Sequence, residues 1–149
     1  MNRTHFVARG PRNSSIRLIV LFAGGLTLAF ASLGGCTSAE NSGVRSVPQE
    51  EIVHGLSLGR TPILLDVRSR EEFAGGHLPG AVLIPVDELP GRLEELRQLG
   101  AEREIVVYCE SGRRALRAAE ALVSEGFGRV GHLEGDMSGW RTSGLPVKR

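Results

Sequence analysis

Short apolar runs alternate with amphipathic segments along the chain from residue 47 onward. The apolar runs cover residues 63–67, 81–84, 104–108 and 130–133. The runs at 63–67 and 104–108 are almost unbroken, which is typical of strands that are buried on both faces of a sheet. We therefore predict parallel strands, with residues 104–108 in the middle of the sheet.

Helical patterns occupy the segments between these strands. We predict a short helix that begins near Pro48. Four further helices are predicted over residues 69–73, 88–99, 113–125 and 138–143. In residues 88–99, for example, Leu93, Leu96 and Leu99 share one face. Strands that alternate with helices predict one α/β domain over residues 47–149, with a mostly parallel sheet covered by helices on both faces.

The beginning of the chain has the pattern of an export signal followed by a tether. Residues 1–17 are polar and basic, residues 18–33 are apolar, and Leu33-Gly34-Gly35-Cys36 closes the segment with small residues. This ending resembles a bacterial lipobox, which implies cleavage before Cys36 and a lipid on its sulfur. We therefore predict a signal peptide over residues 1–35 and a lipidated, flexible tether over residues 36–46. The lipid would anchor the domain to the periplasmic or extracellular face of a bacterial membrane.

Two other interpretations of this segment stay open. Residues 18–35 contain four glycines, and their length is at the short end of the roughly 17–25 residues that span a membrane as an uncleaved helix. Alternatively, the segment is an ordinary signal peptide that a cysteine follows by chance. The position of Cys36 at the expected cleavage point favours the lipoprotein.

The charge of the chain is unevenly distributed. The formal net charge is +1, but residues 1–35 carry four arginines and no acid, so the remainder from Cys36 onward has a net charge of −3. A mildly acidic domain with one Trp offers nucleic acid neither a basic field nor a stacking platform. The histidines are scattered and the chain has no closely spaced cysteine pair, so we predict no metal site and no cofactor.

The residues with the clearest chemical signature follow the central strand. Cys109 ends this strand, Glu110-Ser111-Gly112 forms a polar loop, and an Ala-rich helix begins at Arg113. A strand–loop–helix turn directs backbone N–H groups at one point, where they stabilise a thiolate or a sulfur-loaded cysteine. If Cys36 is lipidated, Cys109 has no disulfide partner. A reactive role is then favoured over the alternative of a small buried apolar residue.

Several motifs, in their order and spacing, resemble the rhodanese (thiosulfate sulfurtransferase-like) family. They include Leu65-Asp66-Val67-Arg68, Gly76-His77-Leu78-Pro79-Gly80, Tyr108-Cys109-Glu110-Ser111-Gly112-Arg113-Arg114, Leu133-Glu134-Gly135 and Gly144-Leu145-Pro146-Val147. The resemblance covers roughly residues 47–148. It implies a doubly wound, five-stranded α/β fold with the active-site loop at the carboxyl end of the central strand.

The resemblance also implies an activity. In this family a cysteine at the position of Cys109 takes sulfane sulfur from a small donor such as thiosulfate or a persulfide. It then passes this sulfur, held as an enzyme persulfide, to a thiol, cyanide or protein acceptor. Arg114 is expected to hold the oxyanion end of the donor, and Asp66 and Arg68 to support the site structurally. The full set of expected substrate-binding residues is Glu110, Ser111, Gly112, Arg113 and Arg114.

Two residues, Glu110 and Asp136, complicate the expected site. Glu110 places a carboxylate next to Cys109, which would destabilise a thiolate and repel thiosulfate, so that the natural donor would be less negative. Alternatively, Glu110 points to solvent or pairs with Arg113 or Arg114, and both interpretations stay open. Asp136 follows Gly135 where many relatives have a glycine, which puts the shape of that loop in question.

Three other functions compete with sulfur transfer. The intact Cys109, Gly112 and Arg114 argue against a non-catalytic rhodanese-fold binding module. The absence of a resolving cysteine in the domain argues against a thiol-redox or persulfide-sensing protein. A cysteine-based phosphatase requires a C-x5-R loop, and here the arginine arrives one residue sooner. Fold alone decides none of these alternatives.

Overall fold

The computed structural model of the chain describes residues 43–100 and 102–149. The predicted signal peptide (1–35), the predicted lipidation site Cys36 and most of the predicted tether lie outside the described residues. Within the described part of the chain, no helix is both long enough and apolar enough to cross a membrane.

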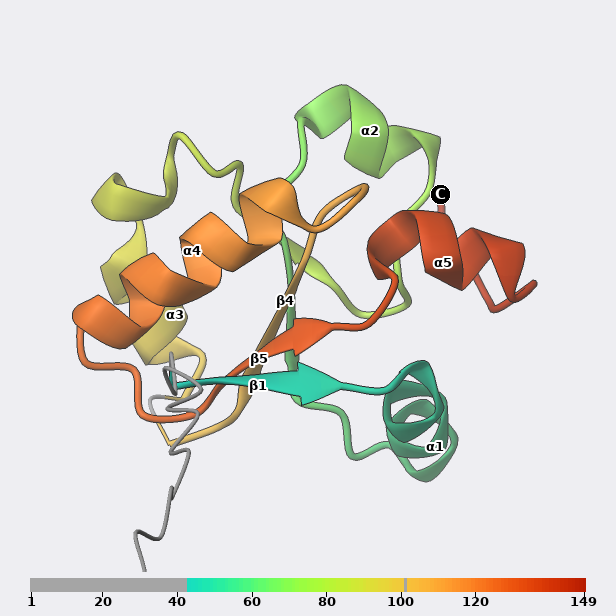
Figure 1. Cartoon of the computed structure of the whole chain (residues 1–149), viewed down its shortest axis with the longest axis horizontal. Helices are drawn as coiled ribbons and strands as arrows, with labels where there is room; N and C mark the ends of the chain where they lie inside the picture. The colour runs from blue at the N-terminus through green and yellow to red at the C-terminus, as the bar shows by residue number, and fades with distance from the viewer. Residues whose placement is uncertain (1–42, 101) are drawn as a thin grey trace, which may run out of the picture. The chain divides into compact units, whose positions relative to one another are not determined.

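Five strands form one sheet in the order β1-β5-β4-β2-β3, and every neighbouring pair is parallel (Figure 1). The strands are β1 (Val44–Val47), β2 (Ile63–Asp66), β3 (Val82–Leu83), β4 (Ile105–Tyr108) and β5 (Val130–Leu133). β4 lies in the centre, between β2 and β5. The predicted five-stranded α/β sheet with a central strand at residues 104–108 is therefore confirmed.

Helices cover both faces of this sheet. They are α1 (Gln49–Leu58), α2 (Arg70–Gly75), α3 (Leu93–Gln98), α4 (Arg113–Ser124) and α5 (Asp136–Thr142), with a 3-10 turn, η1 (Leu89–Gly91). Figure 1 shows α3 and α4 on one side of the sheet and α1 and α5 on the other. The helices on opposite sides enclose two separate apolar clusters.

The central strand contributes to both clusters because its successive side chains point to opposite faces. Ile105 and Val107 pack into the cluster beneath α4, and Val106 and Tyr108 pack into the cluster with Trp140 of α5. All four side chains of β4 are buried, which explains why its sequence is apolar without alternation. Burial of a Val or Ile side chain stabilises the fold by roughly 1.5–3 kcal/mol, so the site follows a strand that is held firmly in the core.

Strand β1 differs from the sequence prediction. Residues 44–46 were assigned to the tether (36–46), but the structure pairs β1 with β5 from Val44↔Val130 to Val47↔Leu133. Only Val47 of this edge strand is buried, so the pattern lacks the apolar run that marks the other strands. The prediction that residues 44–46 belong to a flexible tether is therefore wrong.

The predicted helix over residues 88–99 is also divided. The structure forms η1 first and then α3, with Arg92 between them in a non-helical conformation (φ −123°). Pro90 lies in the first turn of η1, where its missing N–H costs nothing, whereas the interior of a continuous helix would lose a hydrogen bond there.

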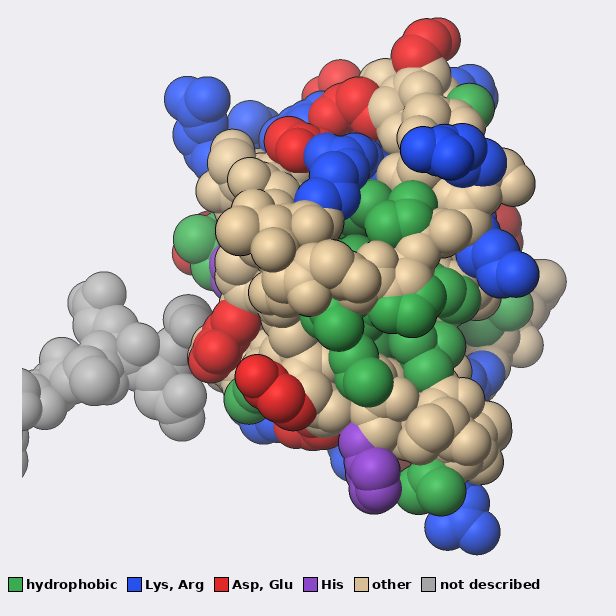
Figure 2. Space-filling model, turned by 90° about the vertical axis from the view of Figure 1, so that its right-hand side faces the viewer, with side chains coloured by type: hydrophobic (Ala, Val, Ile, Leu, Met, Phe, Trp, Pro, Cys, Tyr) green, Lys and Arg blue, Asp and Glu red, His purple; other side chains and the backbone are tan. Residues whose placement is uncertain are grey.

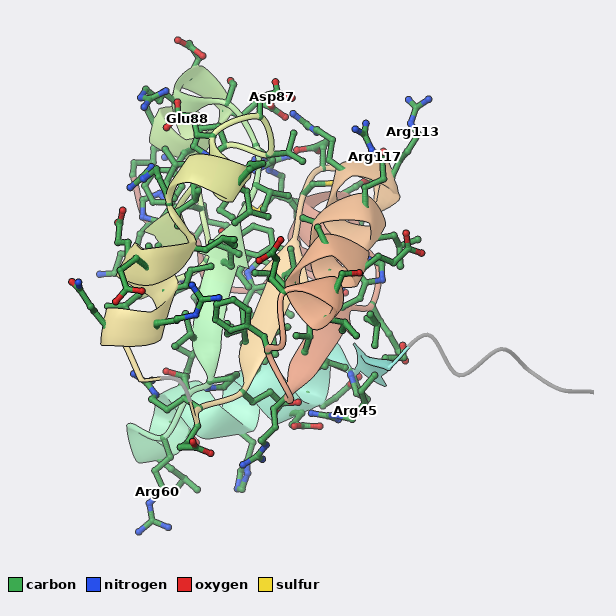
Figure 3. The ribbon with its side chains drawn as sticks, turned by 90° about the vertical axis from the view of Figure 1, so that its left-hand side faces the viewer. Arg45, Arg60, Asp87, Glu88, Arg113 and Arg117 are labelled. Atoms are coloured by element: carbon green, nitrogen blue, oxygen red, sulfur yellow. The ribbon has the colours of Figure 1, made fainter. Side chains whose placement is uncertain are left out.

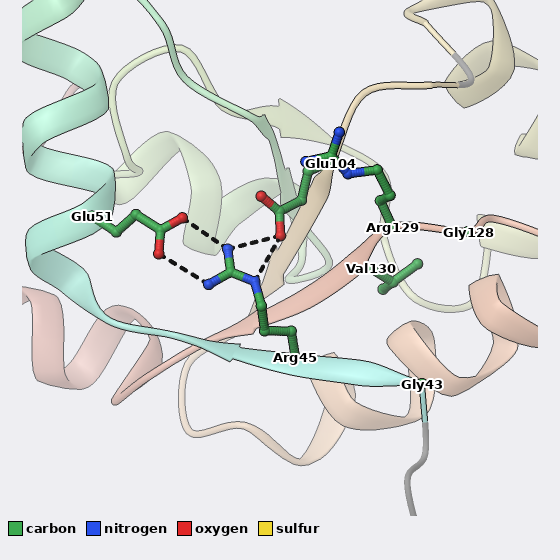
Figure 4. Close-up of a pocket in the computed structure, with 7 residues that line it drawn as sticks. All are labelled: Gly43, Arg45, Glu51, Glu104, Gly128, Arg129 and Val130. Atoms are coloured by element: carbon green, nitrogen blue, oxygen red, sulfur yellow. Dashed lines mark hydrogen bonds and ion pairs between the residues drawn. The ribbon is translucent and has the colours of Figure 1, made fainter.

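Two other surface features lie away from Cys109, a charged pocket and an apolar groove. At the amino end of the strands, the Arg45 guanidinium bonds Glu51 of α1 and Glu104 before β4, each at 2.8 Å, in a pocket that Arg129 also lines (Figure 4). On the face formed by α1 and α5, apolar side chains reach the surface in a groove lined by Val53 and Leu145 (Figure 2).

Candidate active site at the carboxyl edge of the sheet

Cys109 lies where the chain leaves β4 and turns toward α4. Its Sγ accepts a hydrogen bond from the backbone N–H of Gly112 at 3.1 Å. Gly112 adopts a φ of +95°, in the left-handed region that favours glycine, and directly precedes α4. The loop therefore curls back toward the sulfur, and an N–H aimed at the sulfur stabilises its anionic form.

A pocket opens over this sulfur. It has a volume of about 390 Å³ and is lined by Cys109, Ser111, Arg113, Arg114 and Arg117. No carboxylate is among these lining residues, and three of the five carry a positive charge. Figure 3 shows Arg113 and Arg117 projecting from the first turns of α4. The predicted residues Cys109, Ser111, Arg113 and Arg114 are thus brought together, and Arg117 joins them although the sequence analysis did not single it out.

Arg114 is held by a carboxylate from a different helix. Its Nη1 and Nη2 atoms bond Glu72 Oε2 and Oε1 of α2 at 2.7 and 2.8 Å. This pairing lowers the pKa of Glu72 to about 2. The pKa of Arg114 is raised, chiefly by Glu72 and to a smaller extent by Cys109, so Arg114 faces both groups. Glu72 also completes a capping box with Ser69 at the start of α2. Its contact with Arg114 could not be predicted from the sequence.

Glu110 lies outside the lining of the pocket. Its Oε1 accepts a hydrogen bond from Arg141 of α5 at 2.6 Å, and its Oε2 is 3.3 Å from Arg68 Nη1. The alternative in which Glu110 pairs with Arg113 or Arg114 is therefore wrong, because its partners are Arg141 and Arg68. The carboxylate is nevertheless paired with two arginines, neither of which lines the pocket.

Asp66 and Arg68 form a buried pair beneath the loop. Both side chains are fully buried, and Arg68 Nη2 bonds Asp66 Oδ2 at 2.7 Å and the Gly76 carbonyl at 2.8 Å. Burial opposes the charge on Arg68, but the contacts with Asp66 leave the pKa of Arg68 raised. The pair connects β2 to the loop through Arg68 and Glu110, as expected for residues that support the site.

Asp136 is another residue whose role in the site the sequence did not reveal. Its Oδ1 accepts a hydrogen bond from the Cys109 backbone N–H at 2.8 Å, and its Oδ2 lies 3.0 Å from Nε2 of His132 on β5. The N–H of Met137, in the first turn of α5, also donates to the Cys109 carbonyl. The only signal in the sequence was the unusual Gly135-Asp136 step, which predicted an altered loop but not its contact with Cys109.

Comparison with known proteins gives a consistent picture. The model of the rhodanese-like domain family matches residues 49–143. A sulfurtransferase of Allochromatium vinosum is 33% identical over 104 residues, which is 70% of this chain and 94% of that protein. The chloroplastic thiosulfate sulfurtransferase 16 of Arabidopsis thaliana is 35% identical over 119 residues, 74% of this chain and 98% of that protein.

A solved structure shares the arrangement of strands and helices. The rhodanese-related protein of Thermoplasma volcanium superposes with a TM-score of 0.59 at 28% identity, covering 70% of this chain and 97% of that one. The similarity in sequence and in fold therefore extends over the part of the chain that carries the pocket.

Proposed function

Because the chain belongs to the rhodanese-like domain family, we propose that it is a sulfurtransferase that carries sulfane sulfur as a persulfide on Cys109. The observation that carries this proposal is the position of the Cys109 sulfur. It accepts the Gly112 N–H and lines a pocket with three arginines. A thiolate and an anionic donor both gain from such surroundings.

The proposed reaction has two displacement steps. In the first, the Cys109 thiolate attacks the outer sulfur of thiosulfate, a new S–S bond forms, and the bond to the inner sulfur breaks so that sulfite leaves with its electron pair. In the second, an acceptor nucleophile such as cyanide or a thiolate attacks the outer sulfur of the persulfide. The sulfur is transferred and the Cys109 thiolate is restored, without any net redox change in the enzyme.

The positions of the loop residues support thiosulfate, or a persulfide with an anionic group, as the donor. The persulfide is itself an anion, so the N–H of Gly112 and the pocket arginines that favour the thiolate also favour the loaded intermediate. Glu110, the one acidic residue of the loop, is paired with Arg141 and Arg68 and does not line the pocket. These pairs favour the alternative in which Glu110 does not repel thiosulfate.

The proposed function is tested by intact mass measurement of the purified protein. After incubation with thiosulfate, we expect a mass gain of one sulfur atom, and cyanide should remove it. Cys109→Ser should show no gain while its circular dichroism stays that of the parent. If neither thiosulfate nor glutathione persulfide loads the parent protein, the chain is better explained as a non-catalytic binding module than as an enzyme. If Cys109→Ser does not fold, Cys109 is a core residue and the site assignment fails.

We also propose that Cys36 carries the lipid that the sequence pattern predicts. The support is the order of basic, apolar and small residues that ends at Cys36. The test is expression of the full chain in bacteria grown with a clickable fatty acid. Incorporation in the parent and its loss in Cys36→Ser would support a lipoprotein. Membrane association without label would instead favour an uncleaved anchor, and secretion without label an ordinary signal peptide.

A further inference from the structure

Two arginines of α4 stand at the mouth of the Cys109 pocket, and no acidic side chain in the described part of the chain pairs with either of them. Arg113 and Arg117 are four residues apart and so occupy the same face of the helix. Both are exposed and both line the pocket. Figure 3 shows the two side chains next to each other at the end of α4 that lies nearest the active-site loop.

The other arginines around the loop are already paired. Arg114 is bonded to Glu72 through both terminal nitrogens, Arg68 to Asp66, and Arg141 to Glu110. Among residues 43–100 and 102–149, no carboxylate comes within ion-pair distance of Arg113 or Arg117. These two guanidinium groups are therefore the cations of the pocket that remain available to a ligand.

The pairing of Arg114 changes the role that the family resemblance implied for it. A guanidinium binds an oxyanion best through two parallel N–H groups. In Arg114 one N–H of each terminal nitrogen already bonds Glu72, at 2.7 and 2.8 Å, and the carboxylate offsets part of its charge. Arg114 is in this respect a positioning residue that joins α2 to α4 beside Cys109.

From these contacts we infer that Arg113 and Arg117 bind the anionic end of the sulfur donor. The inference rests on the proposed sulfurtransferase function and names its donor class. The donor carries a negatively charged group, such as the sulfonate of thiosulfate, next to its transferable sulfur. Arg117 lies beyond the segment Cys109–Arg114 that the family resemblance assigns to the active-site loop, so donor preference in this chain is set partly by a residue of the helix rather than by the loop alone.

The test compares three single variants and one double variant of the purified protein. Arg113→Gln and Arg117→Gln remove the two proposed contacts. Arg129→Gln removes the same charge at the opposite end of the sheet, in the pocket around Arg45 (Figure 4). We expect kcat/KM for thiosulfate to fall about threefold in each pocket variant and about tenfold in the double variant, as partly exposed ion pairs allow. In Arg129→Gln it should stay at the parental value.

A second measurement separates charge from folding and from the activity itself. Iodoacetate and iodoacetamide both alkylate the Cys109 thiolate, but only iodoacetate carries a negative charge. The ratio of their rates should fall severalfold in the Arg113→Gln, Arg117→Gln double variant and stay unchanged in Arg129→Gln. Raising the ionic strength should reduce the ratio in the parent far more than in the double variant, because salt screens exposed charges.

The outcomes distinguish the inference from the function on which it rests. If all variants load sulfur with the parental kcat/KM and the same alkylation ratio, Arg113 and Arg117 do not bind the anion and the inference is wrong, while the enzyme remains. If the parent itself does not load sulfur, the proposed function fails. If the alkylation ratio falls as much in Arg129→Gln as in the pocket variants, the effect arises from the net charge of the protein. This result would also overturn the inference.

Discussion

The carboxylate of Asp136 accepts a hydrogen bond from the backbone N–H of Cys109 at 2.8 Å. This contact joins the first residue of α5 to the residue that carries the proposed chemistry. Asp136 is almost fully buried, and it is the one residue other than glycine with a positive φ (52°) in the described part of the chain. An aspartate tolerates this conformation better than most side chains. Position 136 therefore requires a residue that tolerates a positive φ and also accepts a hydrogen bond from the Cys109 N–H.

Asp136→Ala is expected to lower the free energy of unfolding by about 2–4 kcal/mol. The change leaves the buried Cys109 N–H without an acceptor, which costs about 1–3 kcal/mol, and strains an alanine at positive φ by about 1 kcal/mol. Asp136→Asn keeps an acceptor oxygen and tolerates the same φ, so it should retain most of the stability. Urea unfolding checks this prediction, and equal losses in the two variants would show that the hydrogen bond contributes nothing.

Gly112→Ala is expected to slow sulfur loading of Cys109 and to destabilise the protein. An added Cβ would lie 3.0 Å from Asp136 Oδ2, and the φ of +95° is one that alanine rarely adopts. The loop would have to move and take its N–H away from the sulfur. Gly128→Ala is the matched control, because its Cβ would meet no atom within 4 Å. Intact mass against time measures loading, and a parental rate in Gly112→Ala would contradict the prediction.

The sequence predicted the centre of the fold better than its edge. The strands β2 and β4 are buried along their whole length, so their unbroken apolar runs were sufficient to identify them. Strand β1 buries only Val47, and its pairing with β5 depends on residues that are more than 80 positions away. The local sequence of residues 44–47 does not indicate this pairing, so residues 44–46 were assigned to the tether.

The site likewise has a part that the sequence predicted and a part that it did not. Cys109, Gly112 and the adjacent arginines form one continuous stretch, so their proximity was visible in the sequence. The contacts of Glu72 with Arg114 and of Asp136 with Cys109 join residues 42 and 27 positions apart. Such contacts arise from the packing of α2 and α5 against the carboxyl edge of the sheet, and helical periodicity does not encode which carboxylate reaches which partner.

Arg68→Met is expected to destabilise the protein by about 3–5 kcal/mol, because it leaves the Asp66 carboxylate buried without its counter-charge. The side chains of Arg68 and Asp66 are both fully buried. Arg70→Met makes the same replacement in a surface pair with Glu88 and should destabilise the protein far less, because solvent screens exposed ion pairs. Urea unfolding of both variants gives the comparison. Similar small losses would mean that water reaches Asp66 in solution.

Glu110→Gln is expected to change kcat/KM for thiosulfate by less than about twofold, since paired exposed charges contribute little at a distance. The carboxylate is held by Arg141 and Arg68 and does not line the pocket. Steady-state assay with cyanide as acceptor checks this outcome. A severalfold gain in the variant would restore the hypothesis that Glu110 repels anionic donors.

The pair of Glu72 and Arg114 is expected to make stability depend on acid pH. Arg114 lowers the pKa of Glu72 from 4.5 to about 2, so the folded protein holds this carboxylate ionised where the unfolded chain begins to bind a proton. The contribution is complete above about pH 4.5 and is lost as the pH falls toward 2.

Glu72→Gln measures this contribution and keeps the capping role, because glutamine also closes a capping box with Ser69. The side chains of Glu72 and Arg114 are about one-third exposed, so solvent screens the pair and we expect a loss of only about 1 kcal/mol at neutral pH. The difference in unfolding free energy between parent and variant should shrink to zero as the pH approaches 2, since other carboxylates titrate equally in both proteins. A difference that stays constant with pH would attribute the loss to packing of the side chain rather than to its charge.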